Sequence, residues 1–561
     1  MNELLRNIEG GDLKQIDIVK MYHNKKCLII DDFPTIRGSL SRTLKTFGAE
    51  AVETAANGEE AVRLCSKVKY DIVLCDYNLG AGKDGQQILE EVRFLRVLLM
   101  TSLFVMITGE SSREMVLGAL ECQPDDYITK PYTQASLKVR LDKAIIRHEA
   151  LLPIKRRISN GDYGAALNKC NEMIKSGSRY SSDCIKMKGH LHFLLKQLKE
   201  ARAVYESVLD KKPVVWAKLG MSKTLIELGR FDAAEELLQE IIDEDERYIE
   251  AHDLLADVYQ HRKDNLAAQR STENATRISP KSALRHRRLA KLAELNHDSE
   301  TSLKSYQQAI KWGLNSCHES EQDYFNYARK ASEMVKGDDS TQAKTIVKQA
   351  NNYLDRARKR FSSRPDVLAQ AQMVETQVYL GAGNKEKAEA SAKKAKVMYS
   401  DLVAPPIEAS LEYARSMTAM GDEEGARELL TRLAARHEND PEIIQIIDSI
   451  TGEPITHAGK KIAATLTKEG ISSYEGKAFT EAISVFNKAL EAYPRHVGLN
   501  LNLLQAMLSD TEHNGYNPEY LAASRRCIRM IGEVPEKDKQ YKRLAFIKKQ
   551  LGKHYPEALS A

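Results

Sequence analysis

The feature that most constrains the fold of this chain is a helical self-similarity with a period of about 34 residues. Small side chains recur at the same point of successive units, at Ala234, Ala268 and Ser302. Two antiparallel helices approach closely only where small side chains lie at their crossing, and a proline such as Pro213 ends the second helix of a pair. The period therefore predicts stacked helical hairpins, which form an extended array rather than one compact core.

The repeated units resemble the tetratricopeptide (TPR) family. In the unit at residues 188–213, the small, aromatic and proline positions of the family pattern are occupied by Gly189, Ala201, Tyr205, Val208 and Pro213. The resemblance is good over 182–312 and around 472–494, and the longer spacing between these blocks predicts longer helices or inserted turns. We expect about ten hairpins in all, with a break at residues 451–454.

Five short β-rich runs precede the repeats and alternate with amphipathic helical segments. The runs are 27–31, 51–55, 71–76, 103–108 and 126–129. This alternation predicts a doubly wound α/β domain of the flavodoxin-like class, with five parallel strands. The expected organisation is an N-terminal extension (1–24), the α/β domain (25–152), TPR repeats (153–313), divergent TPR-like hairpins (314–450), and a C-terminal TPR with capping helices (451–561).

Acidic and hydroxyl residues follow the strands of the expected sheet. Asp31 and Asp32 end the first run, Asp76 the third and Thr108 the fourth, and Lys130 follows the fifth. Ligands of such folds bind beyond the carboxyl ends of the strands, so these side chains should converge. Three crowded carboxylates repel one another, which predicts a hard divalent cation with oxygen ligands, most plausibly Mg²⁺. Lys130 and Thr108 are then placed to hold an anion.

The order and spacing of these residues resemble the receiver domain of bacterial two-component response regulators. Asp32 and Asp76 are 44 positions apart, and Thr108 and Lys130 are 22 apart, as in that family. The resemblance implies that Asp76 is the phosphoacceptor, which takes a phosphoryl group from a histidine kinase or phosphotransfer protein. The implied Mg²⁺ ligands are Asp31, Asp32, Asp76 and the backbone carbonyl of Asn78. A paired Asp after a strand can also be only a helix N-cap, a reading that the other matching positions disfavour.

Further roles follow from the same resemblance. Thr108 and Lys130 would bind the phosphoryl oxygens, and the peptide bond from Lys130 to Pro131 is expected to be cis. Tyr127 fits the aromatic that moves with Thr108 in the switch, although it could belong only to the core. Asn78 and Glu110 occupy the positions that tune the lifetime of the phosphorylated form. The loop 78–85 departs from the family pattern, since it is one residue longer and has Gly80 where proline is common.

The charge and the apolar runs of the chain bear on whether nucleic acid, an acidic partner or a membrane is expected to bind. The chain has 83 Lys and Arg against 79 Asp and Glu, a net charge of +4, which gives no reason to expect nucleic acid as a partner. The run 285–288 (Arg-His-Arg-Arg) is more often a solvated helix face than a site for an acidic partner. No apolar run approaches the roughly 20 residues that cross a bilayer, and residues 1–24 lack a secretory signal. A cytoplasmic protein with no membrane insertion is therefore expected.

Three functions remain open at this point. The leading one is a response regulator without a DNA-binding domain, whose phosphorylation controls the capture of a still unknown protein by the TPR groove. The helix predicted over 134–152 leads directly, through Pro153, into the first repeat, so a rigid join could transmit the switch. The alternative is a constitutive TPR scaffold whose receiver only docks or forms a homodimer. An output enzyme is the third, and apart from the receiver's own phosphoryl transfer we expect none.

Overall fold

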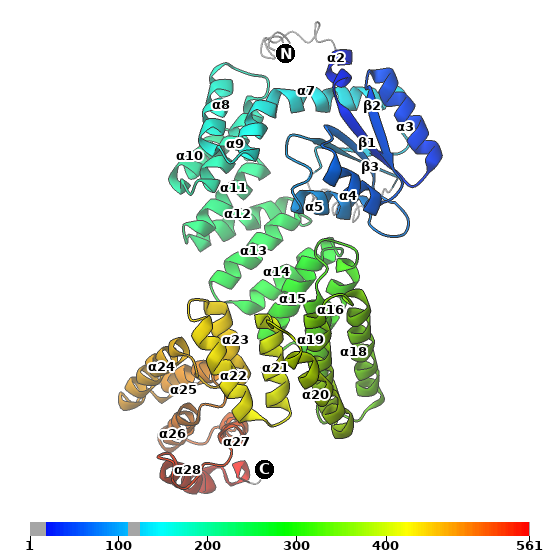
Figure 1. The fold of residues 1–561 in the computed structure, drawn as a ribbon. Coiled ribbons are helices and arrows are strands. Elements are labelled where there is room, and N and C mark those ends of the chain that lie inside the picture. The colour runs from blue at the N-terminus through cyan, green and yellow to red at the C-terminus, as the bar shows by residue number, and fades with distance from the viewer. Residues whose placement is uncertain (1–17, 110–123, 560–561) are drawn as a thin grey trace. The chain divides into compact units, whose positions relative to one another are not determined.

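A computed structural model describes residues 18–109 and 124–559 (Figure 1). The chain forms two compact units, Met1–Tyr327 and Ala328–Ala561. The first contains an α/β domain and helical hairpins, and the second contains helices and no strand up to residue 559, so the predicted fold class is confirmed. The finer domain divisions expected at 313/314 and 450/451 stay predictions. Among the described residues, no helix combines the length and apolarity needed to cross a bilayer.

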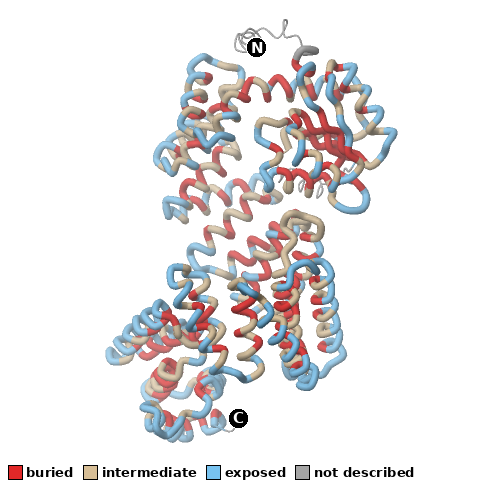
Figure 2. The backbone as a smooth tube through the Cα atoms, in the orientation of Figure 1, coloured by how far each residue is buried: buried red, intermediate tan, exposed pale blue. Residues whose placement is uncertain are grey.

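The α/β domain is built on one parallel sheet with the strand order β2-β1-β3-β4-β5. Its strands are β1 (Lys26–Ile30), β2 (Ala51–Ala55), β3 (Ile72–Asp76), β4 (Leu103–Thr108) and β5 (Asp126–Thr129). β3 and β4 are buried along their whole length, which Figure 2 shows as the red centre of the domain. Strands covered on both faces read as nearly continuous apolar runs, and this explains the sequences IVLCD and LFVMIT.

Helices cover both faces of the sheet. They are α2 (Ile18–His23), α3 (Pro34–Phe47), α4 (Gly58–Lys67), α5 (Gly85–Phe94) and α7 (Gln134–Ser159). Alternate residues of β1 point to opposite faces, so Ile29 packs with α3 and α7 whereas Leu28 packs with α4 and α5. Tyr22 from α2 is fully buried in the first of these cores and donates a hydrogen bond to Asp142. The last residues of the expected N-terminal extension therefore belong to the core of the domain.

The last helix of the α/β domain continues into the repeats without a loop. α7 has 26 residues and contains Pro153, so the expected boundary at residue 152 falls inside one helix. Its first half packs on the sheet through Leu137 and Leu141, and its second half packs on the first hairpin through Leu151 and Ile154. The absence of a flexible linker, expected from the sequence, is confirmed for this described helix.

The hairpins of the first unit have helices of 12 to 15 residues from α8 to α16. They are α8 (Tyr163–Lys175), α9 (Ser181–Leu194), α10 (Leu198–Leu209), α11 (Val215–Glu227), α12 (Phe231–Glu244), α13 (Ile249–His261), α14 (Asn265–Ile278), α15 (Ala283–Leu295) and α16 (Ser299–Gly313). Ala234 and Ala268 are completely buried, as the small-residue rule requires. A Cβ atom at Gly189 would lie 2.7 Å from the ring of Tyr205, so this crossing has room for glycine alone.

α17 (Glu321–Met334) contains the division between the units, and the regular elements described in the second unit are all helices. Its elements are α18 (Thr341–Arg360), α19 (Pro365–Gly381), α20 (Lys385–Ser400), α21 (Ile407–Ala419), α22 (Glu423–Arg436), α23 (Pro441–Thr451), α24 (His457–Glu475), α25 (Phe479–Ala492), α26 (Val497–Asn514), α27 (Glu519–Ile531), α28 (Tyr541–His554) and the short 3₁₀ helix η2 (Pro556–Ala558). α18 has 20 residues, which accounts for the longer spacing seen in the sequence. α23 ends at Thr451 and Gly452 is left-handed, with φ of 66°, so the expected break lies between α23 and α24.

Candidate functional site

The site lies at the carboxyl edge of the sheet. Asp31 follows β1 directly, Asp76 is the last residue of β3, and Thr108 is the last residue of β4. Lys130 follows β5, and its backbone N–H donates to the carbonyl of Thr108 at 2.6 Å. Because all five strands are parallel, these ends meet at one edge, as the sequence predicted.

The three aspartates form a compact oxygen-rich cluster. One carboxylate oxygen from each of Asp31, Asp32 and Asp76 lies within 4.8 Å of the others. Asp31 and Asp76 are 1% and 6% exposed, so solvent screens little of their mutual repulsion. Oδ1 of Asp32 is buried and has no hydrogen-bond partner among the described residues. An all-oxygen cluster with an unsatisfied buried oxygen fits a hard cation such as Mg²⁺.

Backbone contacts hold the first aspartate in place. Oδ1 of Asp31 accepts a hydrogen bond from the backbone N–H of Phe33 at 2.8 Å. The guanidinium of Arg37 donates to the backbone carbonyl of Asp31 at 2.6 Å. These bonds fix the turn between β1 and α3, so the carboxylates of Asp31 and Asp32 are positioned by the fold before any ligand is present.

Lys130 supplies the positive charge of the site. Its ammonium lies 2.9 Å from Oδ1 of Asp76 and 3.5 Å from Oδ2 of Asp31. Burial lowers the pKa of Lys130, but the hydrogen bond and charge of Asp76 outweigh it, so the pKa is raised overall. The expected cis peptide bond between Lys130 and Pro131 is confirmed.

The carboxylate of Asp76 is buried and lies close to two other carboxylates. Burial raises its pKa, and the charges of Asp31 and Asp32 raise it further. The hydrogen bond and charge of Lys130 act in the opposite direction without reversing the shift. A carboxylate that is buried, crowded by like charges and paired with one lysine is favourably placed for metal binding, which would relieve the repulsion.

The remaining predicted site residues differ in their burial and in their contacts. Thr108 is buried at the site, opposite Thr129 in the neighbouring strand. Tyr127 is half-buried and packs against the core that contains α4 and α5. Asn78 is exposed, and its side-chain oxygen accepts a hydrogen bond from Gly80 N–H at 3.3 Å. Glu110 lies outside the described residues.

Two residues near the site were not identified from the sequence. Gly85 begins α5 so close to β3 that an added Cβ atom would lie 2.5 Å from the carbonyl oxygen of Asp76. Asp84 caps the same helix by accepting a hydrogen bond from Gln87 N–H, and the pair forms a capping box. The Asp-Gly-x-Gln order was the available signal, because an Asp three residues before a Gln marks a helix start.

The basic run in the repeats has a different environment from the predicted one. Arg285 makes a two-bond ion pair with Asp253, at 3.0 and 2.8 Å, and Arg288 pairs with Asp257 at 2.7 Å. Arg287 makes a two-bond pair with Asp323, both bonds at 2.7 Å. The prediction of a solvated helix face was wrong because neighbouring helices supply a carboxylate to each of the three arginines. An acidic partner has no unpaired cluster to bind there.

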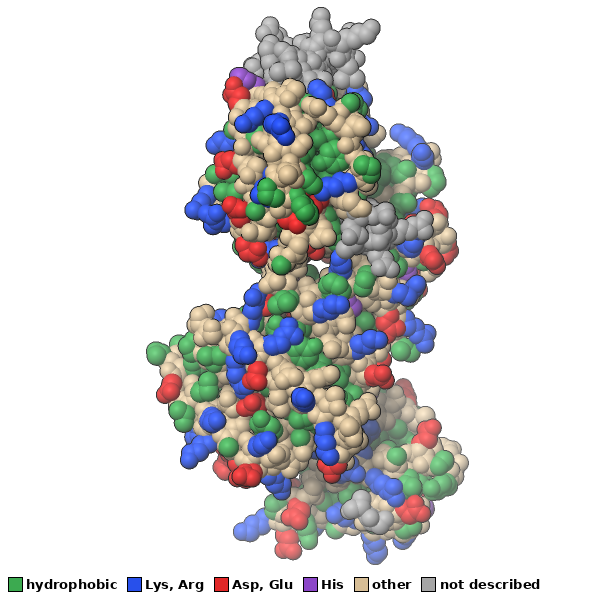
Figure 3. Space-filling model, turned by 90° about the vertical axis from the view of Figure 1, so that its right-hand side faces the viewer, with side chains coloured by type: hydrophobic (Ala, Val, Ile, Leu, Met, Phe, Trp, Pro, Cys, Tyr) green, Lys and Arg blue, Asp and Glu red, His purple; other side chains and the backbone are tan. Residues whose placement is uncertain are grey.

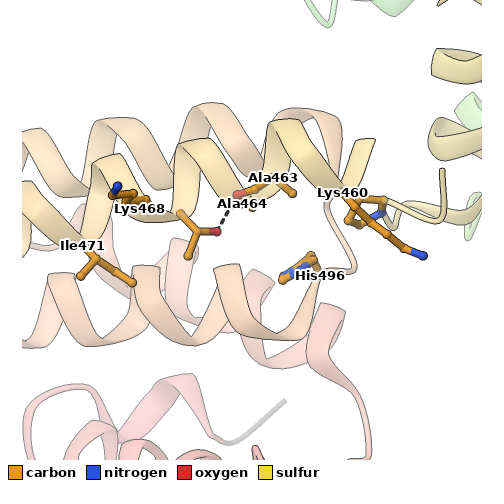
Figure 4. A pocket seen from close by; sticks show the side chains of 8 residues that line it. Lys460, Ala463, Ala464, Lys468, Ile471 and His496 are labelled. Carbon is orange, nitrogen blue, oxygen red and sulfur yellow. Dashed lines mark hydrogen bonds between the residues drawn. The ribbon is translucent and has the colours of Figure 1, made fainter. Parts of the chain in front are cut away.

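A hollow of about 400 Å³ lies on the C-terminal repeat, along α24 (Figure 4). Its floor is apolar and includes Ala463, Ala464 and Ile471, and Lys460 and Lys468 flank it. Figure 4 shows the side chain of His496 on the facing side. The hollow thus combines an apolar floor with flanking lysines.

Family comparisons agree with both parts of the architecture. The model of the response regulator receiver domain matches residues 27–142, and two tetratricopeptide repeat models match residues 192–258 and 408–440. The chain is 35% identical over 124 residues to the chemotaxis protein CheY-3 of Vibrio cholerae, which covers 22% of this chain and 94% of that protein. It is 30% identical over 139 residues to the alkaline phosphatase synthesis transcriptional regulatory protein PhoP of Bacillus subtilis, covering 25% of this chain and 55% of that protein.

Solved structures resemble the same part of the chain. A CheY-like receiver domain protein from Methanospirillum hungatei is 28% identical and covers 22% of this chain and 96% of its own, with a TM-score of 0.21. The chemotaxis protein CheY4 of Vibrio cholerae is also 28% identical and covers 21% of this chain and 98% of its own, with a TM-score of 0.20. With the receiver matched over nearly the full length of CheY-3 and with repeats in the helical part, this chain belongs to the response regulator family and combines a receiver domain with tetratricopeptide repeats.

Proposed function

We propose that this response regulator accepts a phosphoryl group on Asp76 from a histidine kinase or phosphotransfer protein, and that its TPR array is the protein-binding output. The observation that carries the first half is the placement of Asp76. Its carboxylate lies 2.9 Å from the Lys130 ammonium and within one cluster with Asp31 and Asp32. That arrangement combines a nucleophilic oxygen, a fixed cation and a set of metal ligands at one point.

The reaction assigns a role to each residue. Asp31, Asp32, Asp76 and the carbonyl of Asn78 would hold Mg²⁺, which supplies positive charge against which the phosphoryl oxygens can approach. A carboxylate oxygen of Asp76 attacks phosphorus, the new O–P bond forms as the P–N bond to the donor's histidine breaks, and the imidazole leaves. Lys130 then neutralises a phosphoryl oxygen and the Thr108 hydroxyl donates to another, while Tyr127 follows Thr108. Asn78 and Glu110 would set the lifetime of the product.

The output is proposed to be protein binding. Stacked hairpins offer long surfaces suited to a peptide or a partner's helix, and the α24 hollow is one such surface. Lys and Arg side chains intermingle with Asp and Glu over the face in Figure 3, which supports a protein rather than a nucleic acid as the partner. We propose no catalytic activity beyond phosphoryl transfer to Asp76 and its hydrolysis. A homodimer is compatible with this function.

Phosphorylation is tested by intact-protein mass spectrometry after incubation with Mg²⁺ and acetyl phosphate. We expect the wild-type protein to gain the mass of one phosphoryl group, and Asp76→Ala to gain none. Glu50→Gln is the matched control, because Glu50 is an exposed carboxylate of the same domain outside the site. A wild-type protein that gains no phosphoryl group under these conditions contradicts the proposal.

The output is tested by capture of partners from a cell lysate. Protein held with Mg²⁺ and beryllofluoride is compared with Asp76→Ala, and the bound proteins are identified by mass spectrometry. A protein bound by only one of the two forms supports a phosphorylation-controlled output. Identical sets support the alternative function, a constitutive scaffold whose receiver only docks or dimerises.

A further inference from the structure

The receiver contacts the repeat array a second time, far from α7 in the sequence and within the first compact unit. Gln87 on α5 donates a hydrogen bond to the backbone carbonyl of Leu314, just after α16, at 3.2 Å. The imidazole of His318 lies 4.0 Å from the carboxylate of Glu90, and its ring centroid is 6.1 Å from that of Phe94. One face of α5 therefore lies against the end of the α15–α16 hairpin.

Lys281 is the centre of this contact. It lies two residues before α15, next to the N-cap Ser282, and its ammonium donates to the hydroxyl of Tyr77 at 3.4 Å. The same ammonium lies 5.4 Å from the ring centroid of Tyr77 and 5.8 Å from that of Trp312. Its charge also acts on Asp84: burial raises the pKa of Asp84, and Lys281 opposes that rise. A cation between two aromatic faces and a carboxylate is a specific contact rather than an accidental approach.

Backbone packing connects this contact to the phosphoacceptor. Tyr77 is the residue after Asp76, and its carbonyl accepts a hydrogen bond from Gly85 N–H at 2.8 Å. The start of α5 lies against the Asp76 carbonyl so closely that a Cβ atom at Gly85 has no room. Because packed interiors do not deform freely, a shift of the backbone at Asp76 must move Tyr77 and the start of α5 together.

We propose that the α15–α16 hairpin is a docking site for the receiver's own Tyr77–Phe94 segment, and that loading of Asp76 with Mg²⁺ and a phosphoryl group releases it. The proposal rests on the proposed function for its trigger. Metal ligation by the Asn78 carbonyl would shift the backbone beside Tyr77, while Lys281 is held on a different element. Mg²⁺ brings two positive charges and the phosphoryl group about one further negative charge, so the loaded site repels Lys281 more strongly. Release would uncover the α15–α16 surface for a partner.

The contact at Lys281 is a second connection between the receiver and the repeats, distinct from the one expected through α7. That helix joins the two parts covalently as one continuous element. The contact at Lys281 is non-covalent and can open, so it supplies a two-state element that a rigid helix lacks. The pair Tyr77–Lys281 is separated by 204 residues.

Hydrogen–deuterium exchange on the full-length protein tests the proposal. We expect peptides that cover α5 and the start of α15 to exchange slowly in the unloaded protein and about fivefold or more faster with Mg²⁺ and beryllofluoride. Lys281→Ala should show the faster exchange without loading. Lys291→Ala, an exposed lysine of the same helix, should behave as the wild type. A loaded protein with unchanged exchange at both segments, or a Lys281→Ala variant that matches the wild type, overturns the proposal.

Tryptophan fluorescence gives an independent measurement. The chain has two tryptophans, so Trp216→Phe leaves Trp312, which lies beside Lys281, as the single reporter. Its emission should change on loading in that variant and stay constant when Lys281→Ala is added.

Phosphorylation of the same samples is measured by intact mass with acetyl phosphate. Phosphorylation without a change at α5 and α15 refutes the docking proposal alone. A protein that takes no phosphoryl group overturns both the docking proposal and the proposed function.

Discussion

The ammonium of Lys130 lies 2.9 Å from Oδ1 of Asp76, so a positive charge is already held at the proposed phosphoacceptor. The contact is part of a partly buried site, where a charge interaction is stronger than on the surface. The Lys130 side chain therefore does not need to be repositioned when a phosphoryl group binds. Its ammonium only exchanges the Asp76 oxygen for a phosphoryl oxygen.

Removal of the Lys130 charge should slow phosphorylation. We expect Lys130→Ala to lower the rate of labelling by acetyl phosphate by about 100-fold or more, as for the loss of other fixed charges aimed at a transition state. Lys45→Ala is the control, since Lys45 is an exposed lysine of α3. A Lys130→Ala rate within a few-fold of the wild type would show that the lysine is structural. The measurement is phosphoprotein formed against time by mass spectrometry.

The raised pKa of Asp76 predicts a pH-dependent stability in metal-free buffer. Burial is the main cause of the rise, so the folded protein binds a proton at Asp76 more readily than the unfolded chain does. The charged form therefore destabilises the fold above the folded pKa, and this cost disappears as the pH falls through it. Asp76→Asn should melt at a higher temperature than the wild type at pH 7, and the difference should shrink on acidification.

The check is thermal unfolding of both proteins from pH 7 down to pH 4, with EDTA present. Mg²⁺ should reverse the order at neutral pH, because it stabilises the wild-type carboxylates and has fewer ligands in the variant. A melting difference that is constant across the pH range would mean that Asp76 does not titrate in the fold as inferred.

Breaking the ion pair of Arg287 with Asp323 from one side should strongly destabilise the repeats. Asp323 is 1% exposed, so Arg287→Ala leaves a buried carboxylate without its partner, a loss of about 3–5 kcal/mol. Arg270→Ala, at an exposed arginine of α14, should cost less than about 0.5 kcal/mol. Replacing both partners, with Arg287→Met and Asp323→Leu, should recover most of the loss. Urea unfolding monitored by circular dichroism distinguishes these outcomes, and an equal effect of the two arginine variants would contradict the burial argument.

Two glycine substitutions should have opposite effects. Gly85→Ala places a methyl group 2.5 Å from the Asp76 carbonyl and 2.9 Å from the sulfur of Met106, so we expect a loss of about 1–3 kcal/mol. Gly38→Ala on α3 meets no atom within 4 Å, and should stabilise the protein by about 0.5–1 kcal/mol. Phosphorylation should fall in Gly85→Ala and remain unchanged in Gly38→Ala. If both variants are stable and active, the start of α5 is less tightly packed than inferred.

The site could be predicted in large part from the sequence because its residues are tied to local features. Asp76 and Thr108 are the last residues of their strands and Asp31 directly follows β1, and parallel strands bring their ends to one edge without further information. The small residues of the hairpins could also be identified from the sequence. Ala234 and Ala268 lie at helix crossings, which are formed by segments close together in the chain. The positions of strand ends and the period of helices are short-range properties, and for this reason they can be identified from the sequence.

The pairing of side chains across the fold could not be predicted in this way. Nothing near Arg287 indicates that Asp323 lies opposite it, so the basic run was interpreted as solvated although its arginines are paired. The continuity of α7 through Pro153 was equally hidden, because proline in a sequence usually marks a helix boundary. In α7, apolar residues on both sides of the proline find cores to pack against, and this packing outweighs the local preference.

The sequence by itself determined the order of elements, the residues gathered at the carboxyl edge of the sheet, and the presence of hairpin repeats, because these follow from periodicity and strand ends. Only the tertiary structure decided which charges are neutralised, where Gly85 packs against β3, and that Lys281 contacts Tyr77, 204 residues away in the sequence. The physical reason is that such contacts depend on how distant elements stack, and their energies are set by burial and distance rather than by neighbouring residues.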